Sequence, residues 1–137
     1  MSGVLDKAIV LSELGPDERS TLLDFLEPRQ IQEGGALFYN GEESGEMYLV
    51  MEGSVRLEID GSEAGVIGAG DALGAMSLVR IGSRQCGAVA VERCRVLVLT
   101  RASYLRLRAE FPAIALALQE GIVRYVSGEL QSLLDRA

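Results

Sequence analysis

The chain of 137 residues contains no histidine, no tryptophan and only two cysteines. Histidine is the commonest metal ligand and the commonest general base near neutral pH, so its absence argues against a metal-dependent enzyme. A Ser-His-Asp or Cys-His nucleophile system cannot be built from this sequence either. We therefore expect no catalytic residues, no metal site and no cofactor.

Long apolar runs are also missing, since none approaches the roughly 18 residues of a membrane span. The first residues, Met1–Lys7, lack the basic flank and the cleavage pattern of a signal peptide. We therefore expect a cytoplasmic protein, where disulfides are rare. Cys86 and Cys94 are interpreted as small core residues, with a redox role as the alternative.

Positive charge is scarce: the chain has 13 Lys and Arg residues and 20 Asp and Glu residues, which gives a net charge of -7. A protein that reads duplex DNA usually presents a basic face to the phosphates. The densest basic stretch contains only Arg101, Arg106 and Arg108, and we interpret it as the solvated side of a short helix. No helix-turn-helix pattern follows it. We therefore expect no direct contact with nucleic acid.

What the chain has is enough apolar material for a core, at 48% hydrophobic residues. From residue 28 to residue 100 its turn signals recur at roughly 8–12 residue spacing, which is typical of a barrel or sandwich. The signals are Gly34-Gly35, Asn40-Gly41, Glu52-Gly53, Asp60-Gly61 and Gly68–Asp71. This spacing predicts roughly eight short strands.

Individual strands can be placed from their patterns. Val55, Leu57 and Ile59 alternate with polar residues, which indicates one buried face. The preceding run, Met47–Met51, is apolar throughout, and we expect a hairpin at Glu52-Gly53 to join the two strands. A second pair of strands is expected around Glu92-Arg93.

Helical patterns occur at both ends of the chain. Residues 6–14 are interpreted as a lead-in helix, and a second helix is expected to begin at Pro16 and to be stopped by Pro28. After Thr100 we expect a short helix ending at Phe111-Pro112 and then a long one from Ala113 to Leu134. Its apolar stripe consists of Leu118, Ile122, Val126, Leu130 and Leu133.

The long helix also carries two glycines seven residues apart, Gly121 and Gly128. They would lie on one side of the helix and could let a partner helix come close, or they could merely weaken the helix. We expect a homodimer through this helix or contact with an effector protein.

These patterns together predict one domain spanning residues 1–137. It is mainly β: an eight-stranded, jelly-roll-like β-roll over residues 28–100. An N-terminal helical segment covers about residues 1–27, and a C-terminal helical subdomain covers residues 101–137.

The candidate site is the segment from Gly70 to Cys86. Backbone N–H groups at the start of a short helical turn can cradle a phosphate, and one arginine can add a charge-assisted contact. Gly74 would let the backbone approach closely, and Arg84 would face the same cavity, with Leu57 and Val66 as apolar walls. The alternatives are that Arg84 pairs with a carboxylate and that Gly74 only forms a bulge.

The same segment resembles the phosphate-binding cassette of cyclic nucleotide-binding domains. The family pattern is roughly Phe-Gly-Glu-(Leu/Ile)-Ala-Leu, a short loop, and Pro-Arg-(Ser/Thr/Ala)-Ala. This chain has Leu73-Gly74-Ala75-Met76-Ser77-Leu78, a short loop, and Ser83-Arg84-Gln85-Cys86. The run from Gly41 to Val55 also resembles the family. The ligand-binding residues implied by the resemblance are Leu73, Gly74, Ala75, Met76, Arg84, Gln85 and Cys86.

The chain departs from the family at three contact positions. Ala75 stands where the family has the glutamate that accepts the ribose hydroxyl, Gln85 replaces a small residue, and Ser83 replaces a proline. The resemblance implies a regulatory module for signal transduction whose ligand is cyclic AMP or cyclic GMP, coupled to the C-terminal helix. The alternative is a degenerate member that binds no nucleotide and acts as a dimerisation or protein-docking domain.

Overall fold

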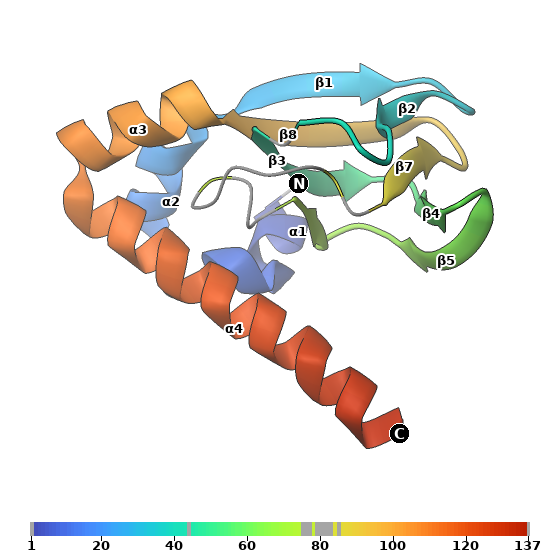
Figure 1. The fold of residues 1–137 in the computed structure, drawn as a ribbon. Helices are drawn as coiled ribbons and strands as arrows, with labels where there is room; N and C mark the ends of the chain where they lie inside the picture. Colours follow the sequence, from blue (N-terminus) through green and yellow to red (C-terminus); the bar gives the residue numbers. More distant parts are fainter. Residues whose placement is uncertain (1, 44, 75–77, 79–83, 85, 137) are drawn as a thin grey trace.

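The computed structural model describes residues 2–43, 45–74, 78, 84 and 86–136. Its described elements run in the order of helices, strands and helices (Figure 1). They are α1 (Ser2–Lys7), the 3-10 helix η1 (Ile9–Leu11), α2 (Pro16–Leu23), β1 (Glu27–Ile31), β2 (Ala36–Phe38), β3 (Glu46–Glu52), β4 (Val55–Ile59), β5 (Ser62–Ile67), β6 (Ala72–Leu73), β7 (Gly87–Ala90), β8 (Cys94–Thr100), α3 (Arg101–Glu110) and α4 (Pro112–Arg136).

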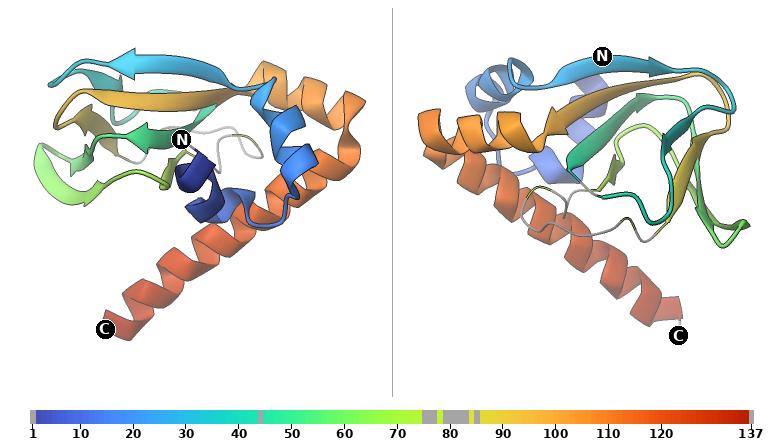
Figure 2. Two further views of the ribbon diagram at one scale, coloured as in Figure 1. Left: turned by 180° about the vertical axis from the view of Figure 1, so that it is seen from behind. Right: turned by 45° about the horizontal axis from the view of Figure 1, so that its top comes forward.

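The eight described strands form two antiparallel four-stranded sheets. One sheet has the order β1-β8-β3-β6 and the other has the order β2-β7-β4-β5. The expected mainly β roll with helices at both ends is confirmed, and the views in Figures 1 and 2 place the helices beside the first sheet.

Two apolar clusters lie on the two faces of the first sheet. The inner cluster fills the roll between the sheets and consists of Phe38, Tyr48, Val50, Val55, Leu73, Ala88, Ala90, Cys94, Val96 and Val98. The helical cluster contains Met47, Leu49, Met51 and Leu99 of the sheet together with residues of every helix from η1 to α4. The middle of β3, Met47–Met51, is therefore buried on both faces, because successive side chains enter different clusters.

The expected pairing of neighbouring strands is wrong at two places. β3 and β4 lie in different sheets, and so do β7 and β8, so neither Glu52-Gly53 nor Glu92-Arg93 closes a hairpin. Both turns carry the chain from one sheet to the other. Gly53 has φ +95° and its Cα faces the Arg93 carbonyl, so the two crossings pack against each other. The hairpin at Asp60-Gly61, where Ile59 pairs with Ser62, is a true one.

Two expectations about the N-terminal segment are also corrected. Residues 6–14 do not form one helix, because α1 ends at Lys7 and Ala8 has extended backbone (ψ 114°) before η1 begins. Pro28 does not stop α2, which ends at Leu23; it lies inside β1. A proline is tolerated there because β1 is the edge strand of its sheet and needs no N–H at every position.

The C-terminal helices have the expected lengths and break. Thr100 caps α3 by accepting a hydrogen bond from the Ser103 N–H at 3.1 Å, and Pro112 opens α4. Leu118 and Ile122 are buried in the helical cluster, whereas Val126 is 41% exposed. The side chains of Leu130 and Leu133 lie outside the described part.

Gly121 has a different role from the one expected. Its Cα packs on the main chain of η1, where a Cβ would overlap the Val10 carbonyl, so this face of α4 is already occupied by the chain itself. Gly128 has open space around it. In the part of the chain that the structure covers, no helix combines the length and apolar character that a membrane crossing requires.

Candidate functional site

Gly74 and Arg84 lie next to each other at the C-terminal end of β6. Gly74 follows the last residue of that strand and has φ +69°, a backbone conformation that disfavours other residues. A Cβ at this position would overlap the Arg84 guanidinium and would lie 2.7 Å from the Glu46 carbonyl oxygen. Gly74 therefore leaves room for the Arg84 guanidinium, and the close approach to a phosphate expected of it stays a prediction.

Arg84 is held inside the roll by both its main chain and its side chain. Its N–H donates to the Glu42 carbonyl at 2.7 Å and its carbonyl accepts from Gly41 at 3.0 Å. Its Nη2 donates to the Glu46 carbonyl at 2.9 Å, and its guanidinium carbon lies 4.2 Å from the centre of the Phe38 ring. This cation–π contact and the carbonyl bond orient a side chain that is only 8% exposed.

The electrostatic environment of Arg84 combines burial with negative neighbours. Burial lowers its pKa from the usual value, while Tyr48, Glu46 and Glu42 act in the opposite direction. An arginine remains protonated in spite of such a shift. The roll therefore contains a partly desolvated positive charge.

Sequence reasoning missed the polar network around this charge. The Glu46 carboxylate accepts hydrogen bonds from the Tyr48 hydroxyl at 2.7 Å and from Arg29 Nη2 at 3.1 Å. Glu46 and Tyr48 lie on the same face of β3, and Arg29 lies two residues before Ile31, which packs against the inner cluster. The signal that could have found Glu46 is the strand alternation that places it with Tyr48.

The network keeps Glu46 ionised and Tyr48 neutral. Burial alone would raise the pKa of Glu46, but the bonds from Tyr48 and Arg29 outweigh it and hold this pKa below the usual value. Burial, with the Glu46 hydrogen bond second, raises the pKa of Tyr48 to about 12. At neutral pH the wall beside Arg84 thus carries a fixed carboxylate.

The other residues expected at the site are partly accounted for. Leu73 is buried in the inner cluster, and Cys86 packs against it with a thiol whose pKa burial raises. Ala75, Met76 and Gln85 lie outside the described residues. Leu57 lines the inside of the roll as expected, whereas Val66 is 54% exposed and is not a wall of the cavity.

The remaining chemistry of the described residues is limited. Cys94 is fully buried with its Sγ 3.2 Å from the Ser54 carbonyl, consistent with a core residue. Both cysteines are free thiols. No group of three or more His, Cys, Asp or Glu side chains within the described ranges is arranged to hold a metal ion.

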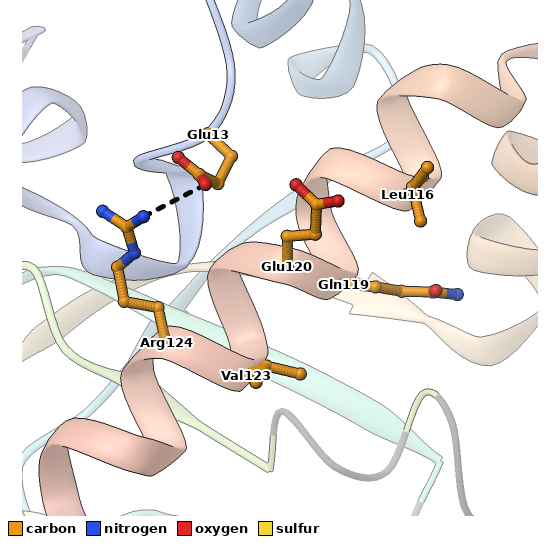
Figure 3. A pocket seen from close by; sticks show the side chains of 6 residues that line it. All are labelled: Glu13, Leu116, Gln119, Glu120, Val123 and Arg124. Carbon is orange, nitrogen blue, oxygen red and sulfur yellow. Dashed lines mark hydrogen bonds and ion pairs between the residues drawn. The ribbon is translucent and has the colours of Figure 1, made fainter.

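A groove of about 510 Å³ lies along α4, away from the roll interior. Arg124 reaches across to Glu13, before α2, at 3.1 Å, and Leu116 and Val123 project from the helix on another side (Figure 3). Leu116 is 56% exposed, Val123 64% and Val126 41%, so α4 has an apolar stripe that the described part of the chain does not cover.

Comparison with known proteins identifies the family. The family described as "Cyclic nucleotide-binding domain" matches residues 28–111. The "Cyclic AMP receptor protein" of Thermus thermophilus is 36% identical over 107 residues, which are 74% of this chain and 50% of that protein. A "cAMP-dependent protein kinase regulatory subunit" of Yarrowia lipolytica is 32% identical over 108 residues, 77% of this chain and 28% of that protein.

A solved structure agrees with these matches. The crystal structure of Thermus thermophilus Catabolite Activator Protein superposes with a TM-score of 0.75 at 32% identity, covering 91% of this chain and 61% of that one. The chain spans half or less of the length of the two relatives named above. On the family match, the relatives and the roll itself, the chain belongs to the family of cyclic nucleotide-binding domains.

Proposed function

We propose that this domain senses a cyclic mononucleotide, cyclic AMP or cyclic GMP, by binding its phosphate at Arg84 and the cassette backbone, and that binding is transmitted to α4. The observation that carries the proposal is the position of Arg84. It is a charged side chain brought into the roll and oriented by Glu46 and Phe38 next to Gly74.

The electrostatics favour an anion of low charge at this place. Burial disfavours the charged form of Arg84, so a phosphate oxygen beside it would restore interactions that the guanidinium gives up on leaving water. The ionised Glu46 nearby opposes a second negative charge. A cyclic phosphodiester, with a single negative charge, suits this balance better than a phosphate monoester.

Contacts between the cassette and α3 support the coupling. Leu78, within the cassette, is 1% exposed and belongs to the helical cluster with Leu107 and Leu118. Its carbonyl accepts a hydrogen bond from Arg101 Nη1 at 3.2 Å, at the first turn of α3. A shift of the cassette on ligand binding would therefore change its contacts with α3 and α4. Through such a change the ligand would have different affinities for two positions of the helices, as coupling requires.

The names of the relatives support the choice of ligand and the regulatory role. One is named as a receptor for cyclic AMP and the other as a regulatory subunit of a cyclic-AMP-dependent kinase. We propose a role of the same kind here, as a sensing module without catalysis of its own.

Thermal unfolding with ligand tests the proposal. At a ligand concentration about 100 times Kd, binding stabilises the folded state by about 2.7 kcal/mol, which raises Tm by roughly 8–14 °C in a domain of this size. Arg84→Ala should abolish the rise, whereas Arg56→Ala, which removes an arginine paired with Glu58 at 2.9 Å on β4, should keep it. An unchanged Tm of the wild type in millimolar cyclic AMP and cyclic GMP would contradict the proposal.

The exposed stripe of α4 favours a second candidate, a dimerisation domain that uses a second copy of the chain. Leu116, Val123 and Val126 share one side of the helix, at spacings of seven and three residues, and they are exposed. In this candidate the dimer forms through α4 without any nucleotide. An association that is independent of ligand, combined with no thermal shift, would favour it over the sensing module.

A further inference from the structure

Glu46 is placed beside the phosphate position that we propose. Its carbonyl oxygen accepts Arg84 Nη2 at 2.9 Å, and the same oxygen lies 2.7 Å from where a Cβ of Gly74 would be. Its side chain lies on the face of β3 that also bears Tyr48, a member of the inner cluster. The carboxylate therefore belongs to the wall of the roll next to Arg84.

This carboxylate has acceptor capacity beyond its present bonds. Oε1 accepts from the Tyr48 hydroxyl and Oε2 from Arg29 Nη2. An ionised carboxylate offers about four acceptor sites on its two oxygens. Its side chain keeps 29% of its surface exposed, so protein atoms do not enclose it completely.

The two bonds also fix where the carboxylate lies. The Tyr48 hydroxyl, which donates its one proton to this carboxylate at 2.7 Å, lies 3.3 Å from the carbonyl oxygen of Leu37, one residue before the Phe38 ring that stacks on Arg84. Arg29 holds the other oxygen and is itself bonded to Glu27 at 3.2 Å. An acceptor positioned in this way gains more from a ligand hydroxyl than a mobile one, because little further ordering is needed.

A cyclic nucleotide presents one hydroxyl that such an acceptor would meet. Its 2′-hydroxyl is on the carbon next to the one that carries a phosphate oxygen, so a group that accepts from it must lie beside the cation that holds the phosphate. Ala75, which follows Gly74 in the sequence, has a methyl side chain that cannot accept a hydrogen bond.

Resting on the proposed function, we infer that Glu46 accepts the hydrogen bond of the ribose 2′-hydroxyl and makes the site select ribose over 2′-deoxyribose. A hydrogen bond to a charged acceptor is worth a factor of about 10–150 in affinity. The wild type should therefore bind the ribonucleotide more tightly than its 2′-deoxy analogue by about tenfold or more.

Calorimetric titration of four proteins with two ligands tests this inference. The ligands are cyclic AMP and 2′-deoxy cyclic AMP, or the guanine pair if that binds more tightly. The proteins are the wild type, Glu46→Gln, Glu46→Ala and the control Glu58→Gln. Glu58 is 30% exposed and ion-paired like Glu46, but it alternates with Val55 and Leu57 on β4 and so faces away from the inner cluster.

The quantity compared is the ratio of the two Kd values within each protein, because a purely structural disturbance weakens both ligands alike. We expect Glu46→Gln to reduce the preference for ribose severalfold, since a neutral amide replaces the charged acceptor, and Glu46→Ala to remove it. Glu58→Gln should keep the wild-type ratio.

Two results would overturn the inference while leaving the proposed function intact. One is a wild type that binds both ligands equally, and the other is a ribose preference that survives in both Glu46 variants. Failure of the wild type to bind either ligand would instead refute the proposed function, and the inference with it.

Discussion

Replacing Gly74 by alanine should disturb the site through one methyl group. The new Cβ would overlap the Arg84 guanidinium and lie 2.7 Å from the Glu46 carbonyl oxygen, the acceptor that orients this arginine. The φ of +69° at this position is also unfavourable for alanine. The substitution should therefore both destabilise the fold and displace Arg84 from its carbonyl and ring contacts.

The two effects can be given magnitudes and separated by a control. The left-handed backbone costs alanine about 1–2 kcal/mol, and the shifts needed to relieve the overlap add about 1–3 kcal/mol. Gly74→Ala should thus lower the free energy of unfolding by about 2–5 kcal/mol. Gly70 has φ +94° and no neighbour within 4 Å of its added Cβ, so Gly70→Ala should show the backbone cost alone.

Urea unfolding of both variants, followed by nucleotide titration, measures these quantities. Gly74→Ala should have the lower denaturation midpoint of the two and should bind cyclic nucleotide more weakly than Gly70→Ala does. Equal stability losses in the two variants, or undiminished affinity in Gly74→Ala, would refute the reasoning about the close approach of Gly74 to Arg84.

Four other predictions concern α4 and the network of Glu46. Gly121→Ala should lower the free energy of unfolding because its methyl meets the main chain of η1, whereas Gly128→Ala should raise it by about 0.5–1 kcal/mol as a helix substitution in open space; thermal melts of both check this. Val123→Glu should shift any dimer toward monomer in light scattering without lowering Tm, because its side chain is 64% exposed; an unchanged mass would exclude this stripe from the interface. The pKa of Glu46 is lowered in the folded state, so its ionised form stabilises the fold at pH values above the unfolded-state pKa. This stabilisation is lost as the pH falls through the folded-state pKa. Glu46→Gln should therefore be less acid-sensitive than the wild type in pH-dependent urea melts. The pKa of Tyr48, raised to about 12, predicts the opposite slope: its contribution is complete below the unfolded value near 10 and is lost between about pH 10 and 12, so Tyr48→Phe should flatten the stability curve there.

Local patterns predicted the strand region and the two C-terminal helices, but not the break between α1 and η1. Alternation and turn residues predicted the strand region, and the 3.6-residue period together with Pro112 predicted the break between α3 and α4. The partners of the strands were not predictable in this way. A turn such as Glu52-Gly53 looks like a hairpin in sequence whether its strands pair or enter opposite sheets, and only the packing of both sheets decides which occurs.

The same distinction between local patterns and long-range packing applies to the residues of the site. Gly74 and Arg84 could be named in advance because they belong to one short contiguous motif. The contact between Glu46 and Arg29 could not be predicted, because it joins residues 17 positions apart across β8 and depends on the register of three strands. Gly121 was misinterpreted for a similar reason, since the η1 main chain that it contacts lies more than a hundred residues earlier.

The most direct test of the account is calorimetric titration of the purified wild type, Arg84→Ala and Arg56→Ala with cyclic AMP and cyclic GMP. The account predicts that the wild type and Arg56→Ala bind at least one of the two ligands with equal affinity, and that Arg84→Ala loses about 30-fold or more. Equal binding by Arg84→Ala and the wild type, or no binding heat from the wild type at millimolar ligand, would contradict the claim that this roll holds a cyclic phosphate at Arg84.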